Sequence, residues 1–461
     1  MIDTETTLLR FAPHLEQLPP SAIREICRLV ALPDIRSLAG GWPDPAVFPT
    51  VEIRTILDED LRTAGSQALQ YGATEGLLEL RQLLARQAAA EGLTLTPEHL
   101  MLTQGSQQAM DLAAAAFLDP GDVAIVGCPT YVGGTGAFAT VGAELVGVPV
   151  DAEGIDPDAL HRRLRTLAAR KRPARLLYVI PNFQNPDGSM MPLERRRALV
   201  ELAERYNFVI VEDDPYGALR FEGEELPSLA ALDRAGRVIL ARSFSKTVSP
   251  GLRLAWVAAA PEVIRRLGVV KQYRDCCSGN LSQQVVLGFL KRGLFEPYLV
   301  RLRGHYRAKR DRMLAALDRH FPATARWNRA TGGFFVWITL PDGLDGEALL
   351  QEALKRKVAF VPGRPFHVDG SGGNTIRLSF SQSDDATIDT AVADLGEALR
   401  ELAARPRPVV ERQAKSKPAR QPKPKAKAKS KPVRKSKPAR QPKPKAKAKS
   451  KPARKTARRR R

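Results

Sequence analysis

The sequence predicts an α/β protein in which helices cover a mostly parallel sheet, followed by a smaller α+β region and a basic tail. Three observations lead to this prediction. Short apolar runs alternate with helical patterns between residues 100 and 258. Long helical stretches at about 281–320 and a second, smaller set of strand and helix patterns follow, up to residue 404. The last 57 residues show neither pattern.

Six apolar runs in the first region have the length and composition of buried strands. They are LMLT (100–103), VAIVG (123–127), LLYVI (176–180), FVIVE (208–212), VILA (238–241) and LAWVA (254–258). Helical patterns lie between most of them, at 107–117, 157–170 and 192–206. Because such alternation is typical of parallel strands with helices on both faces, we expect one doubly covered sheet here.

A second, smaller α+β pattern lies between residues 333 and 404. It consists of GFFVWITL (333–340), a helix at 346–356, VAFVPG (358–363), NTIRLSFS (374–381) and a final helix at 384–404. We therefore expect a large domain at 46–300 and a small domain at 301–404. The N-terminal segment, 1–45, is expected to contribute to the small domain, and 405–461 forms the tail.

The formal net charge of +22 is concentrated in the tail. From Arg405 onward there are 26 lysines and arginines and one acidic residue, which leaves 46 basic and 49 acidic residues in the preceding 404. The segment KSKPARQPKPKAKAKSKP occupies 415–432 and recurs at 435–452. Since the tail has no apolar side chain larger than valine, it cannot bury enough surface to offset chain entropy, and we expect it to be disordered.

Two interpretations of this polycation remain open. It could bind DNA, RNA or another polyanion without sequence preference, by release of counterions. It resembles the Lys-Ala-Pro tails of linker histones in composition, although it has no aromatic residue that could stack on bases. The second interpretation is a solvated appendage, grown by duplication of the repeat, with no selected partner.

Several classes of protein are not expected. The sequence has no run of about 18 uncharged apolar residues, so no membrane span is expected. The N-terminus lacks the pattern of a signal peptide, and we therefore expect a cytoplasmic protein. The four cysteines show no CxxC pair and no disulfide spacing. We expect buried, reduced thiols and no metal site, although adjacent Cys276 and Cys277 could be redox-active.

Polar residues follow five of the predicted strands. In open α/β sheets, ligands bind outside the carboxyl ends of the strands, so these residues are expected to gather around one ligand. In chain order they are Ser106, Tyr131, Asn185, Asp213 with Tyr216, and Ser243 with Lys246. Such a set suits a phosphorylated, electron-poor aromatic aldehyde.

The phosphate of such a ligand would lie at a predicted helix start. The segment Gly105-Ser106-Gln107 offers free N–H groups and the positive end of the helix dipole. Ser243 and Ser245 can add hydroxyl donors, and Arg253 can add a charge-assisted hydrogen bond.

The remaining residues suit the ring and the carbonyl. Lys246 would form a Schiff base, and burial together with a neighbouring arginine would lower its pKa. Asp213 would keep a ring nitrogen protonated, which makes the ring an electron sink. Tyr216 and Asn185 could donate to a phenolate oxygen, and Tyr131 could stack on the ring.

These segments resemble the signatures of fold-type I pyridoxal-phosphate aminotransferases of class I/II. SFSKTVSPGLRLAW (243–256) resembles the lysine segment of that family, and TQGSQQAMDL, PNFQNPDG, VEDDPYG and NTIRLSFS resemble its other motifs. The resemblance covers about residues 15–404. Counterparts of IREI, LAGGWPDPAVFP and LQYGATEG make the chain most similar to the α-aminoadipate, multi-substrate subgroup.

The resemblance implies the type I fold, the cofactor pyridoxal 5′-phosphate and ping-pong transfer of an amino group from an L-amino acid to a 2-oxo acid, plausibly 2-oxoglutarate. The donors it implies are 2-aminoadipate or a broad range of aromatic and branched-chain amino acids. Lys246 would then carry the cofactor and move the substrate Cα proton, while Asp213 would pair with the pyridinium nitrogen. The other cofactor contacts implied are Asn185 and Tyr216 to the 3′-oxygen, and Ser106, Gln107, Ser243 and Arg253 to the phosphate.

The resemblance also implies a homodimer, in which Tyr71 reaches the phosphate of the partner subunit. Arg377 would clamp the substrate α-carboxylate, and Gly40 would lie against the substrate. Arg24 is a candidate for recognising an acidic side chain. Both Arg24 and Arg377 could instead be solvated surface residues.

Single residues and the reaction itself can also be interpreted differently. Tyr131 could be a packing residue, and Asp213 could cap a helix, for which Asp214 is the better candidate. GTGAFA (134–139) fits a dinucleotide fingerprint but follows a Pro-Thr-Tyr turn, so no such site is expected. The rivals to transamination are β-elimination or racemisation on the same scaffold, and a nucleic-acid-binding protein with an aminotransferase-like sensor domain.

Overall fold

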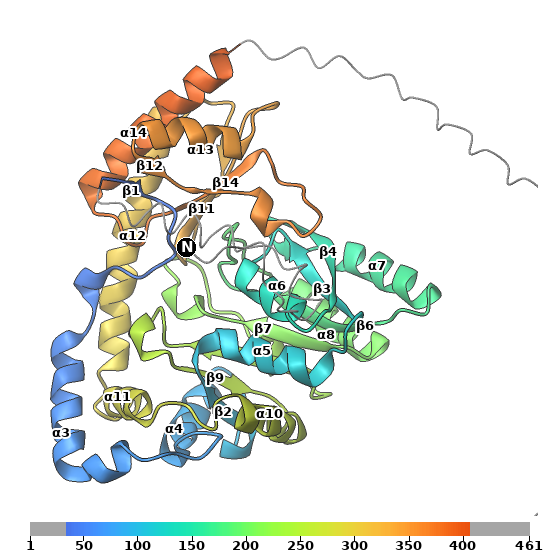
Figure 1. Ribbon diagram of the computed structural model, residues 1–461, viewed down its shortest axis with the longest axis vertical. Helices are drawn as coiled ribbons and strands as arrows, with labels where there is room; N and C mark the ends of the chain where they lie inside the picture. Colours follow the sequence, from blue (N-terminus) through green and yellow to red (C-terminus); the bar gives the residue numbers. More distant parts are fainter. Residues whose placement is uncertain (1–33, 406–461) are drawn as a thin grey trace, which may run out of the picture. The chain divides into compact units, whose positions relative to one another are not determined.

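The computed structural model describes residues 34–405 of the chain (Figure 1). The predictions for Arg24, for Cys27 and for the basic tail from Pro406 onward lie outside the described residues.

An eight-stranded mixed sheet forms the first part of the fold. Its strand order is β2-β9-β8-β7-β6-β3-β4-β5. Strands β4, β3, β6, β7 and β8 run parallel, whereas β9 is antiparallel to both of its neighbours and β5 is antiparallel to β4. The bounds are β2 (Leu100–Thr103), β3 (Val123–Cys128), β4 (Glu144–Asp151), β5 (Gly154–Ile155), β6 (Ala174–Val179), β7 (Val209–Asp213), β8 (Val238–Ser243) and β9 (Ala255–Ala258).

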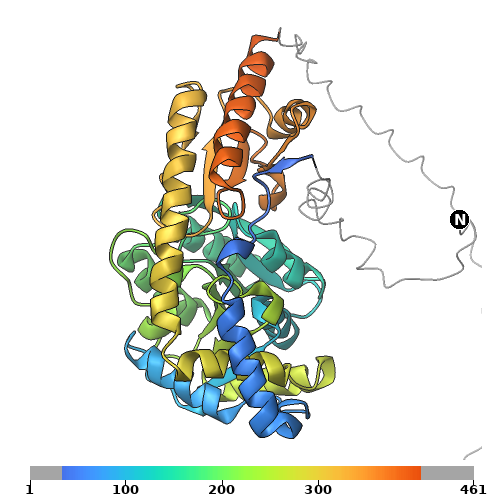
Figure 2. The same cartoon turned by 90° about the vertical axis from the view of Figure 1, so that its left-hand side faces the viewer.

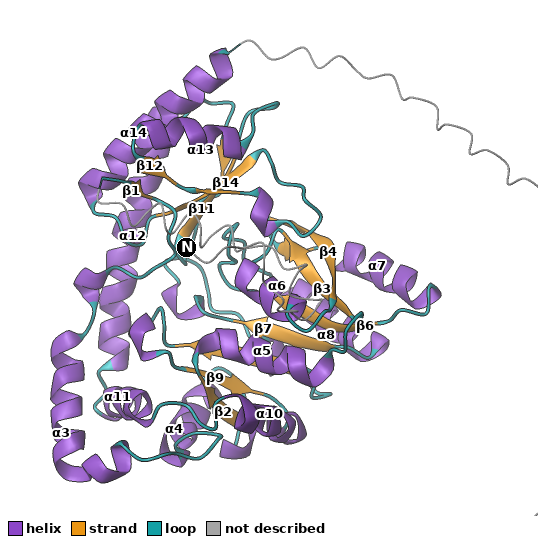
Figure 3. Cartoon of the chain, viewed as in Figure 1, coloured by secondary structure: helices purple, strands orange, loops and turns teal. Residues whose placement is uncertain are grey.

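Helices cover both faces of this sheet, as the apolar runs predicted (Figure 3). In β6, Leu176 and Tyr178 belong to one buried cluster, while Leu177 and Val179 belong to another. This alternation follows from the two-residue period of a strand. The first cluster also includes residues of α5 (Gly105–Phe117), α6 (Val132–Ala139) and α10 (Pro261–Arg274), and the second includes residues of α7 (Pro157–Ala169), α8 (Leu193–Tyr206) and α9 (Leu229–Leu232).

A four-stranded antiparallel sheet forms the second part, in the order β10-β11-β14-β13. Its strands are β10 (Arg326–Trp327), β11 (Phe335–Thr339), β13 (Val361–Pro362) and β14 (Thr375–Ser379), and α13 (Gly346–Lys355) and α14 (Asp385–Ala404) accompany them. Separately, β1 (Arg36–Ser37) pairs in parallel with β12 (Val358–Ala359). The N-terminal end of the described chain therefore lies beside this second part.

Long helix α12 (Phe295–His320) connects the two parts (Figure 2). At one end it packs along α14. Toward its other end, Arg303 Nε donates a 2.8 Å hydrogen bond to the carbonyl of Ala218, beyond β7. Helix α11 (Asn280–Lys291) packs against both α3 (Thr50–Ala68) and α4 (Leu78–Ala89), on the side of β2 and the lower half of α12.

Two further predictions can be compared with the described residues. No helix between residues 34 and 405 combines the length and the apolarity that a membrane crossing needs. The cysteines in this range, Cys128, Cys276 and Cys277, are free thiols. The expectation that they are buried is wrong, because Cys276 is exposed and the other two are half-buried. Cys276 lies in the turn after α10, where it has a positive φ of 64°.

Candidate active site

A cavity of about 320 Å³ lies at the carboxyl ends of the parallel strands, between the two parts of the fold. The eight-stranded sheet contributes the residues that follow β3, β6, β7 and β8, together with the start of α5. The smaller part contributes one residue each from β11 and β14, and the segment after β1 completes the wall. The lining residues are Gly40, Gly41, Trp42, Ser106, Gln107, Tyr131, Ile180, Asn185, Asp213, Pro215, Tyr216, Ser243, Ser245, Lys246, Pro250, Arg253, Phe335 and Arg377.

One end of the cavity is built to hold an anion. Helix α5 begins at Gly105, has no acidic residue in its first turn, and presents its free N–H groups to the cavity at Ser106 and Gln107. Arg253 lies beside this helix start, with Nη1 3.5 Å from Ser245 Oγ and Nη2 3.4 Å from the carbonyl of Gln104. Ser243 Oγ donates a 2.9 Å hydrogen bond to Ser245 Oγ. Two hydroxyls, a guanidinium and a helix N-terminus therefore converge.

Gly105 is required at this place for two reasons. Its φ of +74° lies in the left-handed region, and a Cβ built on it would be 2.5 Å from Arg253 Nη2. Gly105 is thus not a wall of the cavity but the residue whose missing side chain admits the guanidinium.

Asp213 ends β7 inside the cavity and is 2% exposed. Tyr178 donates a 2.9 Å hydrogen bond to Oδ2, while Oδ1 is buried and has no hydrogen-bond partner. Burial raises the pKa of this carboxyl to about 7, against the lowering effects of the Tyr178 hydroxyl and of Lys246. Because a buried acceptor without a donor costs free energy, Oδ1 is suited to receive a donor from a bound molecule.

The helix-cap alternative for Asp213 is wrong. The cap-like contact belongs to Asp214, whose Oδ1 accepts hydrogen bonds from the Gly217 N–H at 2.9 Å and from Asn182 Nδ2 at 3.0 Å. Arg242 Nε also donates to Asp214, at 3.2 Å. Asp214 is therefore engaged on the protein side, which leaves Asp213 to face the cavity.

Lys246 lies in the same cavity, in the turns that follow β8. Its Nζ donates a 2.8 Å hydrogen bond to the carbonyl of Gly41. Burial lowers its pKa to about 8, and the positive charges of Arg377 and Arg253 add to this effect, while Asp213 opposes it. An amine with this pKa is partly unprotonated near neutral pH, so it can act as a nucleophile or as a base.

Arg377 is buried, and the alternative that it is a surface residue is wrong. It lies in the middle of β14, is 2% exposed, and its guanidinium packs 4.2 Å from the ring centroid of Phe335. Its Nη1 donates to Asn185 Oδ1 at 2.8 Å, and its Nη2 donates to the carbonyl of Ala39 at 2.6 Å. The segment after β1 therefore holds the guanidinium at the cavity wall.

Three more predicted residues complete the wall. Tyr216 is buried and makes edge contacts with the rings of Phe334 and Phe335, at centroid distances of 5.5 and 5.8 Å. Asn185 is 6% exposed and presents its side chain next to Arg377. Tyr131 stands at the start of α6, and burial raises its pKa. All three line the cavity and carry polar atoms.

Of the predicted site residues that the structure describes, Tyr71 and Gly105 do not line the cavity. Tyr71 is 81% exposed on the segment after α3 and does not line the cavity of its own chain.

Gly40, in contrast, lines the cavity, and a Cβ there would be 3.0 Å from the ring of Trp42. The sequence did not single out Trp42 or Phe335 as site residues, although Trp42 lies in the segment LAGGWPDPAVFP and Phe335 lies in the predicted strand GFFVWITL. It also missed Tyr178, which lies within a predicted strand where every residue had the character of core.

We expect Tyr178→Phe to weaken the binding of a cationic donor at Asp213. In the parent protein the Tyr178 hydroxyl lowers the pKa of Asp213. Its removal should therefore raise this pKa further and reduce the fraction of Asp213 that is ionised. The loss should therefore grow as pH falls below 8, reaching about tenfold in affinity at pH 7, the scale of one hydrogen bond to a charged group. Titration of the cofactor-free protein between pH 6 and 9 with pyridoxal 5′-phosphate, the cofactor that the resemblance implies, measures the loss. Tyr206→Phe, on the opposite face of the sheet, is the control, and equal affinity for both variants would contradict the prediction.

Comparison with known proteins extends these observations. Residues 46–395 match the family model of class I and II aminotransferases. The chain is 44% identical over 397 residues to a 2-aminoadipate transaminase from Thermus thermophilus, covering 86% of this chain and 97% of that protein. It is 40% identical over 382 residues to aromatic-amino-acid aminotransferase 1 from Thermococcus litoralis, covering 83% and 92%. The crystal structure of the α-aminoadipate aminotransferase LysN from Thermus thermophilus, complexed with N-(5′-phosphopyridoxyl)-L-leucine, is similar with a TM-score of 0.78 and 41% identity, covering 86% and 98%.

Proposed function

We propose that this chain, which belongs to the class I and II aminotransferases, transfers an amino group from an L-amino acid to 2-oxoglutarate in two half-reactions of a ping-pong cycle. The observation that carries the proposal is the cavity itself. It combines an anion site at the start of α5, a buried carboxylate oxygen without a partner on Asp213, and the amine of Lys246. These three groups match a phosphate, a protonated ring nitrogen and a carbonyl.

The cofactor is pyridoxal 5′-phosphate, and the residues present fit it. The start of α5, with Ser243, Ser245 and Arg253, would hold the phosphate. Asp213 Oδ1 would accept the hydrogen bond of the ring nitrogen, which satisfies its unpaired state. Asn185 and Tyr216 would contact the 3′-oxygen, and Tyr131 would cover the ring. When bound, the cofactor supplies an aldehyde that takes up the amino group and a ring that stabilises negative charge at the substrate Cα.

Lys246 would bind the cofactor covalently and move the proton at the substrate Cα. Efficient proton transfer needs a base with a pKa near the working pH, and a pKa of about 8 fits this requirement. The 2.8 Å hydrogen bond to the Gly41 carbonyl would orient Nζ while it is protonated. In the second half-reaction the same nitrogen would return a proton to Cα of the new amino acid.

Arg377 would bind the substrate α-carboxylate. Its guanidinium is already oriented by Asn185 Oδ1 and the Ala39 carbonyl, so little side-chain entropy is lost on binding. A fork of two parallel hydrogen bonds would place Cα relative to Lys246 Nζ and set the substrate register.

The amino donor would be 2-aminoadipate or one of a broader range of aromatic and branched-chain amino acids. Relatives named for 2-aminoadipate and for aromatic amino acids support this range. The rings of Trp42 and Phe335 in the cavity suit an apolar side chain. A panel of amino acids, each tested with 2-oxoglutarate, examines the proposal. Release of the matching 2-oxo acid together with glutamate supports it, and release of ammonia or of a D-amino acid instead would overturn it.

Arg24 is proposed to recognise an acidic donor side chain. Arg24→Ala should lower kcat/KM for 2-aminoadipate by about ten- to a hundredfold, the scale of a lost charge-assisted hydrogen bond, and should change the value for leucine much less. Arg28→Ala, four residues further along the sequence, is the control. An equal loss for both donors would assign Arg24 to the solvated surface.

A homodimer with shared sites is also proposed, in which Tyr71 binds the cofactor phosphate of the partner subunit. Its 81% exposure in the single chain leaves the side chain available for this contact. Tyr71→Ala should lower cofactor affinity about tenfold or more. Mixed with Lys246→Ala, it should regain activity, because one of the two sites in each heterodimer then combines an intact Lys246 with an intact Tyr71 across the interface. Tyr273→Ala, at another exposed tyrosine, is the control. Failure of the mixture to regain activity would contradict sharing across subunits.

A further inference from the structure

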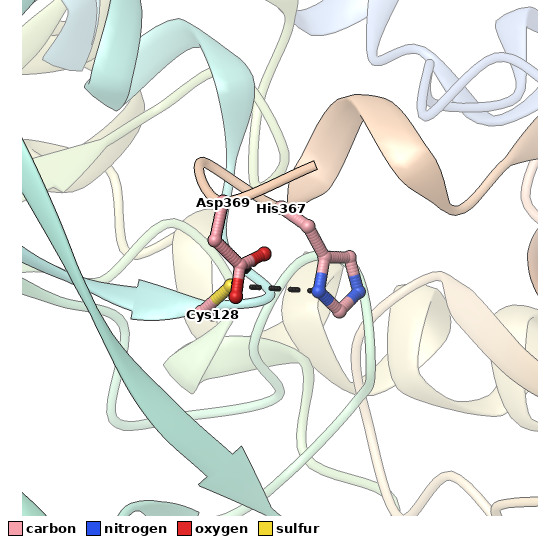
Figure 4. A group of neighbouring side chains, drawn as sticks. All are labelled: Cys128, His367 and Asp369. Atoms are coloured by element: carbon pink, nitrogen blue, oxygen red, sulfur yellow. Dashed lines mark hydrogen bonds between the residues drawn. The ribbon is translucent and has the colours of Figure 1, made fainter. Parts of the chain in front are cut away.

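Three side chains that commonly bind metals meet outside the cofactor cavity. Cys128 is the last residue of β3, and His367 and Asp369 lie in the loop that follows the short helical turn Arg364–Phe366 (Figure 4). Their ligand atoms all lie within 4.8 Å of one another, although Cys128 and His367 are 239 residues apart in the sequence. The thiol points toward both the imidazole and the carboxylate.

The distances suit a tetrahedral centre. Cys128 Sγ is 3.4 Å from His367 Nδ1 and 3.4 Å from Asp369 Oδ1. In a zinc site the Zn–S bond is about 2.3 Å and the Zn–N and Zn–O bonds are about 2.0–2.2 Å, which at the tetrahedral angle places sulfur about 3.5 Å from the nitrogen or oxygen. Sulfur therefore already lies at a suitable distance from both other ligand atoms, and the imidazole nitrogen and the carboxylate oxygen lie within 4.8 Å of each other.

The surrounding structure holds these ligands in place. The Thr130 N–H donates a 2.9 Å hydrogen bond to the carbonyl of Phe366, which ties the loop to the end of β3. Trp337 stacks on the His367 ring at an interplanar angle of 24°. A side chain at Gly372 would overlap the His367 ring, so the glycine makes room for it. Such support from neighbouring groups is what a metal site needs in addition to its ligands.

The ligand atoms also hydrogen-bond to one another and to a neighbouring hydroxyl. The Cys128 thiol donates to Asp369 Oδ1. Ser371 Oγ lies 2.8 Å from His367 Nδ1 and 2.6 Å from Asp369 Oδ1, where it satisfies the same ligand atoms.

We propose that Cys128 Sγ, His367 Nδ1 and one carboxylate oxygen of Asp369 bind a single zinc ion, with water as the fourth ligand. A thiolate and an imidazole select zinc over Mg²⁺ or Ca²⁺, which prefer oxygen ligands. On binding, the Cys128 thiol releases its proton to solvent and the Ser371 hydroxyl turns away. No atom is oxidised or reduced. The exposed position of Asp369 gives the ion a path to the site.

The ion would clamp the loop 367–371 to the end of β3. This clamp lies close to the cofactor cavity, because Tyr131 follows Cys128 by three residues and Phe366 packs 5.0 Å from the Arg377 guanidinium. Zinc would therefore stabilise the region where the two parts of the fold meet. The proposal concerns binding alone and does not depend on the reaction that the chain catalyses.

The test uses full-length holoenzyme in which Cys276→Ser and Cys277→Ser remove the two adjacent thiols. After treatment with a chelator and dialysis, the protein is titrated with ZnSO₄, and separately with CoCl₂. We expect about one ion per chain, a thiolate-to-cobalt absorption band in the near ultraviolet, and a rise in Tm with zinc. Cys128→Ser should abolish the cobalt band, and Asp369→Asn should weaken zinc binding at least tenfold.

Two further measurements separate this result from misfolding or binding elsewhere. Ser371→Ala removes only the competing hydroxyl, so it should bind zinc at least as tightly as the parent. Without metal, Asp369→Asn and the parent should both unfold in one cooperative transition, and only the parent should gain stability from zinc. Absence of stoichiometric zinc binding, or binding that survives Cys128→Ser unchanged, would overturn the proposal.

Discussion

Replacing Lys246 by alanine should reduce transamination by at least about 10⁴-fold and remove the near-visible absorbance of the bound cofactor. The first effect follows from the loss of the group that moves the Cα proton, and the second from the loss of the only covalent link proposed between chain and cofactor. Absorbance spectra of the purified variant with pyridoxal 5′-phosphate and a single-turnover assay measure the two effects.

Two controls distinguish this role from a general effect of the amine on the site. Lys246→Arg keeps a positive charge but is neither a nucleophile nor a base at neutral pH, so it should lose as much activity as the alanine variant. Small primary amines added to Lys246→Ala should restore part of the proton transfer, because the truncated side chain leaves room in the cavity. A retained absorbance band in Lys246→Ala would refute the assignment.

Asp213→Asn should lower kcat/KM by about a thousandfold. The proposed partner of Asp213 Oδ1 is a protonated ring nitrogen, and loss of one member of a buried charge pair costs about 3–5 kcal/mol. The amide cannot hold the ring nitrogen protonated, so the loss should be largest for the chemical step. Steady-state kinetics with saturating cofactor separates this loss from weaker cofactor binding.

Asp214→Asn makes the same chemical change one residue further along the chain. Since Asp214 contacts Asn182, Arg242 and the Gly217 N–H rather than the cavity, this variant should lose thermal stability but keep activity within about tenfold of the parent. Similar kinetics for the two variants would show that Asp213 has no special relation to the cofactor.

The elements that could be predicted are those whose local sequence decides their structure. Strands β2 and β9 are buried at every residue, so they stand out as apolar runs bounded by polar residues. Strand β4 is mostly half-exposed and contains Gly147 and Pro149, and it was missed. Helix α6, with the sequence VGGTGAFA, contains three glycines and has no helical propensity of its own. It forms because Phe138 packs into the buried cluster beneath the sheet.

The residues of the site also fall into two groups, those that the sequence predicts and those whose environment only the tertiary structure shows. The positions of Lys246, Asp213 and Asn185 follow from the rule that parallel strands bring their carboxyl ends to one edge of the sheet. The burial of Arg377 does not follow from any local pattern, because an arginine in a short strand faces solvent unless another segment covers it. Here the segment after β1 provides that cover through the Ala39 carbonyl.

The sequence by itself determined the order of strands and helices, the family of the chain and the polar residues at the strand ends, because these depend on neighbouring residues and on motifs. Only the tertiary structure decided that the pKa of Lys246 lies near 8, that Asp213 Oδ1 has no partner, and that Cys128 meets His367 and Asp369. The physical reason is that desolvation and coordination geometry depend on every atom around a group. In this fold, most of those atoms come from residues that are distant in the sequence.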